Sequence, residues 1–225
     1  MQMDMSPTFF IDSDHPEIKA FSTHYTQNAK TDLDKAIGLY YAVRDEIRYD
    51  PYSIDPRAKT MKASYTLEKK KGYCVAKAVL LAACVRSQGI PARLGFADVK
   101  NHLTTDKLKQ RMGTDLFVWH GYTDIFLNDK WVKATPAFNL GLCKAFGVLP
   151  LEFDGIQDSV FHPLNAKGDR HMEYVRDHGR FSDLPWDTIL KSFMKTYPDF
   201  HEKMGPSSND FRGEALAENI KKKED

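Results

Sequence analysis

The order of its predicted elements places this chain in the α+β class, with one buried helix packed on an antiparallel sheet. The clearest helix is predicted over residues 74–88, CVAKAVLLAACVRSQ, because this segment is largely apolar and ends at Gly89. Residues 116–127 are rich in aromatic and β-branched residues, which favours a strand. The Asn-Asp turn at 128–129 leads into a second strand over 131–135, so a hairpin follows the helix.

Weaker patterns complete the predicted order. Apolar residues at helical spacing over 32–49 indicate a helix that begins near Asp32. Residues 1–30 are expected to be irregular, with two strand-like pieces at most, and the chain from 137 to 184 is expected to be irregular as well. Three further elements are predicted: an amphipathic segment at 64–71, a strand at 92–99 and a helix at about 187–196.

Length and charge limit the organisation and the class of partner. A chain of 225 residues is expected to form one catalytic domain, here over 1–204. From residue 205 the sequence is polar and ends in KKKED, so 205–225 is predicted to be a flexible tail. Deletion of 206–225 is expected to leave the melting temperature nearly unchanged. The net charge of +1 gives no general attraction to nucleic acid or to anionic membranes, and neither is expected as a partner.

The start of the chain and its cysteines favour a cytoplasmic protein. The first residues lack the basic start and apolar segment of a secretory signal, and no apolar run approaches the ~20 residues of a membrane span. The odd number of cysteines, Cys74, Cys84 and Cys143, does not indicate a disulfide framework. There is no phosphate loop or dinucleotide fingerprint, so no cofactor is expected. The sequence does not indicate an oligomeric state.

Cys74 is the candidate nucleophile. It lies in the first turn of the predicted 74–88 helix, where the helix dipole and free backbone N–H groups lower the pKa of a thiol and can receive an oxyanion. Gly72 leaves room for a substrate backbone, and three lysines at 69–71 add positive charge. Cys84, in the middle of the helix, and Cys143, in the irregular segment, are interpreted as ordinary buried residues.

His120 is the candidate base, because a neutral imidazole held in an apolar strand suits a thiol partner. A third group normally orients such an imidazole. If residues 128 and 129 form a two-residue turn, position 120 faces 137, and its diagonal neighbours are Thr135 and Asn139. Asn139 is predicted to orient His120, because it offers a carbonyl oxygen on a longer side chain than Thr135.

Other polar residues are interpreted as structural. His171, Glu173 and His178 lack the i, i+4 spacing of a zinc-binding helix, so no metal site is expected. Glu152, Asp154, Asp183 and Asp187 are expected at the surface or at helix ends.

Together these residues resemble the transglutaminase-like superfamily. The resemblance rests on Gly72-Tyr73-Cys74, on the helix after it, on the GIPAR run at 89–93, and on His120 followed by Trp131-Val132. It covers a motif-bearing core of about 36–137, with 138–204 as a C-terminal extension. Arylamine acetyltransferases resemble this core at the cysteine, but the GIPAR run favours the transglutaminase-like side.

The resemblance implies a papain-like core, a Cys-His-Asp triad and acyl transfer through a thioester. Cys74 and His120 match the family's nucleophile and histidine, whereas the family's aspartate falls on Thr135, which carries no charge. Asn139 or a carboxylate such as Asp154 then has to orient His120, or the site works as a dyad. Protease, transferase and deamidase remain open.

Two functions follow from these residues. The first is a cysteine-dependent hydrolase or acyltransferase that acts on amide or peptide bonds of a peptide or protein. The second is a catalytically inactive module of the same fold that binds a peptide or protein partner, because the acid at position 135 is missing.

Overall fold

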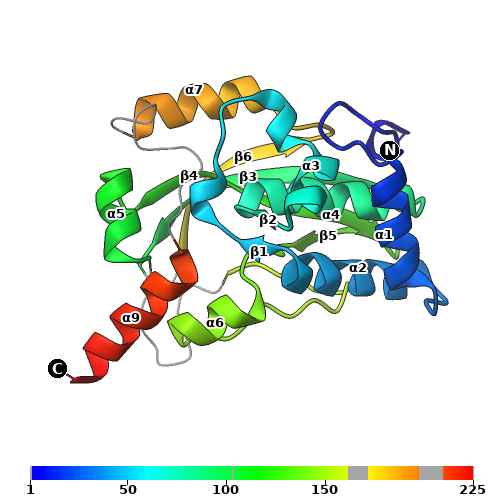
Figure 1. Ribbon diagram of the computed structural model, residues 1–225. Helices are drawn as coiled ribbons and strands as arrows, with labels where there is room; N and C mark the ends of the chain where they lie inside the picture. Colours follow the sequence, from blue (N-terminus) through cyan, green and yellow to red (C-terminus); the bar gives the residue numbers. More distant parts are fainter. Residues whose placement is uncertain (1, 103, 162–171, 198–209, 225) are drawn as a thin grey trace.

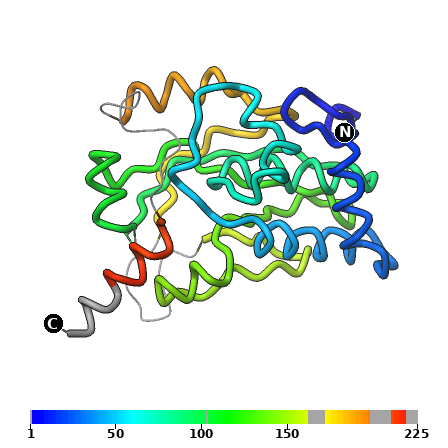
Figure 2. Tube along the Cα trace, in the orientation of Figure 1, coloured from blue at the N-terminus to red at the C-terminus, as the bar shows by residue number. Residues whose placement is uncertain are grey.

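A computed structural model describes residues 2–102, 104–161, 172–197 and 210–224 (Figure 1). It has the predicted α+β architecture: a central helix carries Cys74 and packs on an antiparallel sheet that carries His120. Helix α1 (Pro16–Thr26) lies at one end of the molecule, and α5 (Asp106–Met112) and α9 (Phe211–Glu224) lie at the opposite end. The N- and C-termini are therefore far apart in the chain trace of Figure 2.

Helix α4 (Cys74–Ser87) forms the centre of the hydrophobic core. All of its residues except Ser87 are buried. They are apolar apart from Lys77 and Arg86, whose side-chain nitrogens donate to backbone carbonyls. It packs against α1, α2 (Asp32–Glu46) and α3 (Ala63–Lys69), and against two strands of the sheet. The helix ends where the chain turns through Gly89, whose φ of 78° lies in the left-handed region.

The main sheet has four antiparallel strands in the order β5-β4-β3-β6. Its β4–β5 hairpin has the predicted register, with Leu127 opposite Lys130. Asn128 and Asp129 have φ values of 48° and 62°, as a two-residue turn of the primed type requires. The four strands are β3 (Ala92–Asn101), β4 (Leu116–Leu127), β5 (Lys130–Ala134) and β6 (Met172–Phe181).

Smaller elements frame the start of α4. Two short parallel strands, β1 (Arg48–Tyr49) and β2 (Lys71–Gly72), hold the chain on either side of α3. The remaining elements are η1 (Gln2–Asp4), η2 (Pro51–Ser53), η3 (Ala58–Met61), α6 (Leu140–Phe146) and α7 (Trp186–Thr196).

Two segments expected to be irregular are ordered. The N-terminal stretch contains α1, which begins with Pro16 in its first turn and is capped by the His15 ring, an acceptor from the Glu17 N–H. The stretch after 136 contains α6 and β6. Strand β6 lacks an apolar alternation because it lies at the sheet edge with only one residue, Met172, buried, so nothing local marks it as a strand.

The prediction of a flexible tail also differs from the structure, because residues 211–224 form α9. The ring of Phe211 is buried and packs on Tyr49 and Phe146, with centroid distances of 5.9 and 5.4 Å. The Tyr52 hydroxyl donates to Glu214 Oε2 at 2.6 Å. The helix is polar overall, so the few residues that anchor it leave little trace in the composition. Residues 205–209 and 225 lie outside the described residues.

Phe211→Ala is expected to lower the free energy of unfolding by about 3 kcal/mol, because it removes a buried ring. Leu216→Ala, on the exposed side of the same helix, should change it by less than about 0.5 kcal/mol. Urea unfolding of the two variants and wild type measures both values. Equal stability of the three proteins would mean that α9 does not dock.

Candidate active site

Cys74 is the first residue of α4. The preceding strand β2 ends at Gly72, and Tyr73 is the N-cap with an extended backbone. No side chain caps this helix start, so its first N–H groups are available to other acceptors. The position agrees with the sequence prediction, although Cys74 is only 8% exposed.

Burial decides the protonation state of Cys74. It raises the pKa of the thiol to about 11, and backbone hydrogen bonds from Gly121, Val75 and Cys74 itself oppose the rise without cancelling it. The sequence predicted a lowered pKa from the helix start alone. That prediction is wrong for this closed state, because loss of solvent outweighs three N–H groups.

His120 lies on β4 and is also buried. Burial lowers the pKa of its imidazole to about 4, so the ring is neutral at neutral pH and can accept a proton. Its Nε2 has no hydrogen-bond partner among the residues described. The ring packs beside Phe161, with the centroids 5.5 Å apart.

Cys74 and His120 line the same cavity of about 30 Å³. The space is small and mostly enclosed, large enough for about one water molecule. Aromatic and aliphatic side chains form the rest of its wall, and none of the described lining residues is charged. They are Tyr49, Pro51, Ile54, Tyr73, Leu108, Met112, Phe117, Val118, Trp119, Phe193 and Tyr197.

Gly121 allows strand β4 to approach the start of α4 closely. A Cβ added at this position would lie 3.0 Å from Val75 Cα and 3.2 Å from Val75 Cγ2. Strand β4 therefore touches the first turn of α4 directly, next to both Cys74 and His120. Sequence reasoning missed this residue; the only signal was a glycine directly after the candidate base in an otherwise bulky strand.

A family model described as the transglutaminase-like superfamily matches residues 19–136, about half of the chain. The chain belongs to the transglutaminase-like superfamily. No curated protein matches it.

Solved structures give more distant likenesses. A candidate cysteine protease from Cytophaga hutchinsonii is 14% identical with a TM-score of 0.47, and the match covers 79% of this chain and 52% of that one. A candidate protease from Parabacteroides distasonis is 16% identical with a TM-score of 0.39, over 53% and 23% of the two chains. The arylamine N-acetyltransferase from Mycobacterium abscessus is 11% identical with a TM-score of 0.40, over 59% and 46%. The chain spans about half of the Cytophaga protein and less of the other two.

The three residues considered as the group that orients His120 have different surroundings. Asn139 is the N-cap of α6, and its Oδ1 accepts the Tyr49 N–H at 3.2 Å. The Thr135 hydroxyl is buried and has no hydrogen-bond partner in the part of the chain that is described. Asp154 is exposed and accepts the N–H groups of Ile156 and Gln157, both at 2.8 Å.

The remaining predicted features are structural. Cys84 is fully buried in α4, and Cys143 is buried in α6. The space at Gly72 is filled by Ala76 and Thr66 of the protein itself, since a Cβ there would lie 3.0 and 3.2 Å from their side chains. Of the three lysines at 69–71, Lys71 pairs with Asp50 and Lys69 with Glu68.

Neither a metal site nor a membrane span is found in the described ranges. No three His, Cys, Asp or Glu side chains gather there. Glu173 pairs with His102, His178 pairs with Asp98, and His171 lies outside the described residues. No described helix has the length and hydropathy that crossing a bilayer would take.

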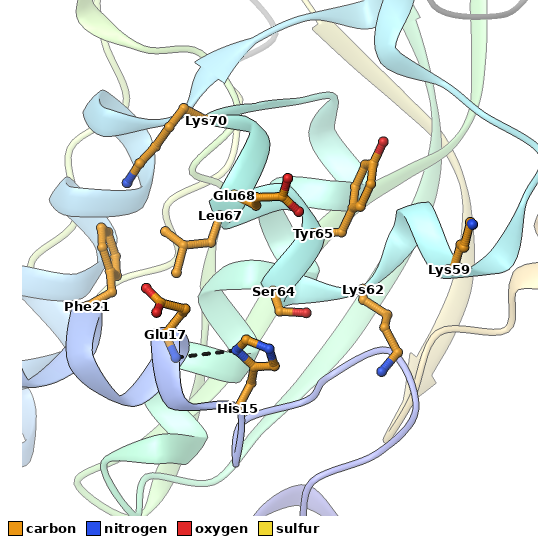
Figure 3. A pocket seen from close by; sticks show the side chains of 10 residues that line it. All are labelled: His15, Glu17, Phe21, Lys59, Lys62, Ser64, Tyr65, Leu67, Glu68 and Lys70. Carbon is orange, nitrogen blue, oxygen red and sulfur yellow. Dashed lines mark hydrogen bonds between the residues drawn. The ribbon is translucent and has the colours of Figure 1, made fainter.

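A larger hollow than the cavity at Cys74 is an open groove of about 800 Å³ between α1 and α3 (Figure 3). Lys70 reaches over the Phe21 ring there, 5.1 Å from its centroid. The Ser64 hydroxyl at its edge donates to Asp12 at 2.6 Å. The groove holds neither Cys74 nor His120, so the smaller cavity is the candidate active site.

Gly121→Ala should disturb both stability and the site. The added methyl group overpacks the contact with Val75, which is expected to cost about 1–3 kcal/mol and to slow alkylation of Cys74 by iodoacetamide. Gly141→Ala is the matched control, because its nearest neighbours would be 3.4 Å away or farther. Urea unfolding and mass spectrometry of labelled Cys74 measure the effects. Two variants that behave alike would argue against a close β4–α4 contact.

His120 should make the protein less stable as the pH falls. Its folded pKa of about 4 lies below its ordinary value of 6.5, so the unfolded chain takes up a proton first. Its contribution is present above pH 6.5 and is lost as the pH falls toward 4, by about 3 kcal/mol in total. His120→Gln should remove this part of the pH dependence. Identical slopes of stability against pH in the two proteins would show that His120 is not buried as a neutral group.

Proposed function

We propose that this chain is a cysteine-dependent hydrolase or acyltransferase that acts on amide or peptide bonds through a thioester on Cys74, with His120 as base. One observation carries the proposal: a thiol at a helix start and a neutral imidazole, whose Nε2 has no hydrogen-bond partner among the described residues, line one small apolar cavity. Membership of the transglutaminase-like superfamily supports the same chemistry.

In the proposed reaction, Cys74 Sγ attacks the substrate carbonyl carbon while its proton passes to His120. The oxyanion that forms accepts hydrogen bonds from backbone N–H groups at the start of α4. The C–N bond then breaks, and His120 returns the proton to the leaving nitrogen. Water completes a hydrolase by attacking the thioester, whereas an acceptor amine completes a transferase; His120 removes a proton from either one.

The resting state favours general-base catalysis over a preformed ion pair. Burial holds Cys74 protonated and His120 neutral, so proton transfer in the closed cavity is unfavourable. When the thiol attacks a substrate carbonyl, the negative charge moves to the carbonyl oxygen, and backbone N–H groups stabilise it there. Proton transfer is therefore coupled to substrate entry.

The cavity wall supports an uncharged acyl group in the substrate. A charged side chain would lose its hydration among the aromatic and aliphatic walls and find no counter-charge among the described lining residues. We propose a peptide or protein amide as the substrate class, without a cofactor. Three free, buried cysteines support a reducing compartment such as the cytoplasm.

Asn139 stays the proposed orienting residue. A carbonyl oxygen has two lone pairs, so Asn139 Oδ1 can accept an imidazole N–H besides the Tyr49 N–H. Thr135 is the alternative, because its buried hydroxyl has no partner among the residues that are described. Asp154 has the least support, since it is exposed and holds two backbone N–H groups. A loss of turnover in only one of Asn139→Ala and Thr135→Val would identify the orienting residue.

An inactive peptide-binding module is the second candidate. Two observations favour it: a threonine stands where the superfamily has its aspartate, and burial raises the pKa of Cys74 instead of lowering it. Under this reading the thiol reacts without help from His120.

Cys74→Ala should reduce turnover to below about a hundredth of wild type, since no other sulfur can form the thioester. The melting temperature should change little, because a small side chain is lost at a helix end. Cys84→Ala is the matched control: it removes a buried thiol from the middle of the same helix and should keep turnover. p-Nitrophenyl esters and fluorogenic peptide amides serve as substrates.

Iodoacetamide labelling separates the two functions. An enzyme should alkylate at Cys74 several-fold faster in wild type than in His120→Ala. Equal rates in these two proteins, together with no turnover of the ester and amide panel, would favour the binding module.

A further inference from the structure

Both neighbours of β3 have a β-bulge close to Asp98. Ala97 pairs with His120 and Val99 with Phe117, so Val118 and Trp119 of β4 face the single residue Asp98. On the other side of β3, Phe96 pairs with Gly179 and Ala97 with Asp177, which leaves His178 of β6 without a partner residue. The bulged residues Trp119 and His178 therefore flank Asp98 from the two neighbouring strands.

The β4 bulge places Trp119 in a backbone conformation that bulky residues rarely adopt. Its φ is 57°, in the left-handed region. Such conformations cost free energy and persist only where the surroundings hold them. Trp119 directly precedes His120, so the backbone conformation at Trp119 sets the direction in which the His120 side chain projects from β4.

Side chains replace the hydrogen bonds that the bulge interrupts. The Trp119 N–H donates to Asp98 Oδ1 at 3.0 Å, and the Val118 N–H donates to the Tyr197 hydroxyl at 2.9 Å. All four residues are buried. Both backbone donors of the bulge are thus satisfied by side chains, which fixes the bulge at this place in β4.

His178 completes the arrangement. Its Nε2 lies 2.6 Å from the same Asp98 Oδ1, and its ring stacks on the Trp119 indole with centroids 4.1 Å apart and planes 10° from parallel. Trp119 is held through its backbone by Asp98 and through its side chain by His178. The indole also lines the cavity that holds Cys74 and His120.

We propose that Asp98 and His178 are positioning residues, which clamp Trp119 and thereby aim His120 into the cavity beside Cys74. The catalytic meaning of this clamp rests on the proposed role of His120. The clamp is proposed to fix where the His120 ring lies, and the position of the ring can be tested without a substrate.

The test uses three variants of the full chain and one control. Asp98→Ala removes the shared acceptor, and His178→Phe keeps the stacked ring but removes Nε2. Asp98→Asn keeps an oxygen for the Trp119 N–H and should rescue most of the effect of the alanine variant. Asp177→Ala is the control: it removes an exposed carboxylate of β6 that bonds Arg180 and the Gly179 N–H and has no contact with Trp119 in the described structure.

NMR of histidine-labelled protein follows the His120 ring, which His120→Gln assigns. Wild type and Asp177→Ala should keep its pKa near 4. In Asp98→Ala and, to a smaller extent, in His178→Phe, the ring should move toward solvent and its pKa should rise toward the ordinary value. If Asp98→Ala does not fold, His178→Phe still reports. A His120 titration that stays unchanged in Asp98→Ala, or in His178→Phe where the alanine variant does not fold, would overturn the proposal, even if stability falls.

Alkylation of Cys74 by iodoacetamide provides the second measurement. Asp98→Ala should slow the His120-dependent part of the rate tenfold or more, and Asp98→Asn should restore most of it. A rate in wild type that does not depend on His120 would contradict the proposed function and leave the NMR result to decide on the clamp. A His120-dependent rate that Asp98→Ala leaves unchanged would overturn the clamp alone.

Discussion

The direct contact between β4 and the first turn of α4 is the constraint on which the rest of this structure depends. Gly121 has no side chain, so the strand backbone can approach Val75 closely, and Cys74 and His120 lie on the two sides of that contact. The mostly apolar surface of α4 holds the helix in the core, and the hairpin register holds β4 in the sheet. Together these features fix the position of α4 against β4, so that Cys74 and His120, from distant parts of the chain, line one small cavity.

Exclusion of water shifts the pKa values of the two candidate catalytic groups in opposite directions, upward for the thiol and downward for the imidazole. It keeps the thiol protonated and the imidazole neutral, which protects the sulfur from oxidation while the cavity is closed. The same dry surroundings strengthen each hydrogen bond to a developing oxyanion. A site of this kind is unreactive at rest and depends on the substrate to supply the charge that its N–H groups stabilise.

The parts of the fold that local patterns determine could be predicted from the sequence. Helix α4 is marked by an unbroken apolar run and a glycine at its end, and the hairpin by its aromatic strand and its Asn128-Asp129 turn. Cys74 at the helix start and His120 in the apolar strand were chosen from local sequence as well, and their catalytic roles stay predictions. Strand β6 and helix α9 were missed, because each is mostly polar and is held by a few distant partners such as Tyr49 for Phe211. The sign of the thiol pKa shift could not be predicted either, since burial depends on α5 and α7, which close the cavity from elsewhere in the chain.

The bulges of β6 also bear on the exposed edge of the sheet. An edge strand presents unpaired N–H and C=O groups that can template another strand. The outer side of β5 is partly occupied, because the Ser159 N–H donates to Lys133 O and the Lys133 N–H donates to Asp158. Strand β6 is irregular instead: the register shifts twice along it, Gly179 has a φ of 90°, and Arg176 and Asp177 are exposed. A flat incoming strand finds no regular ladder there, although Tyr174 and Val175 expose apolar surface, so the irregularity around His178 opposes edge-to-edge pairing.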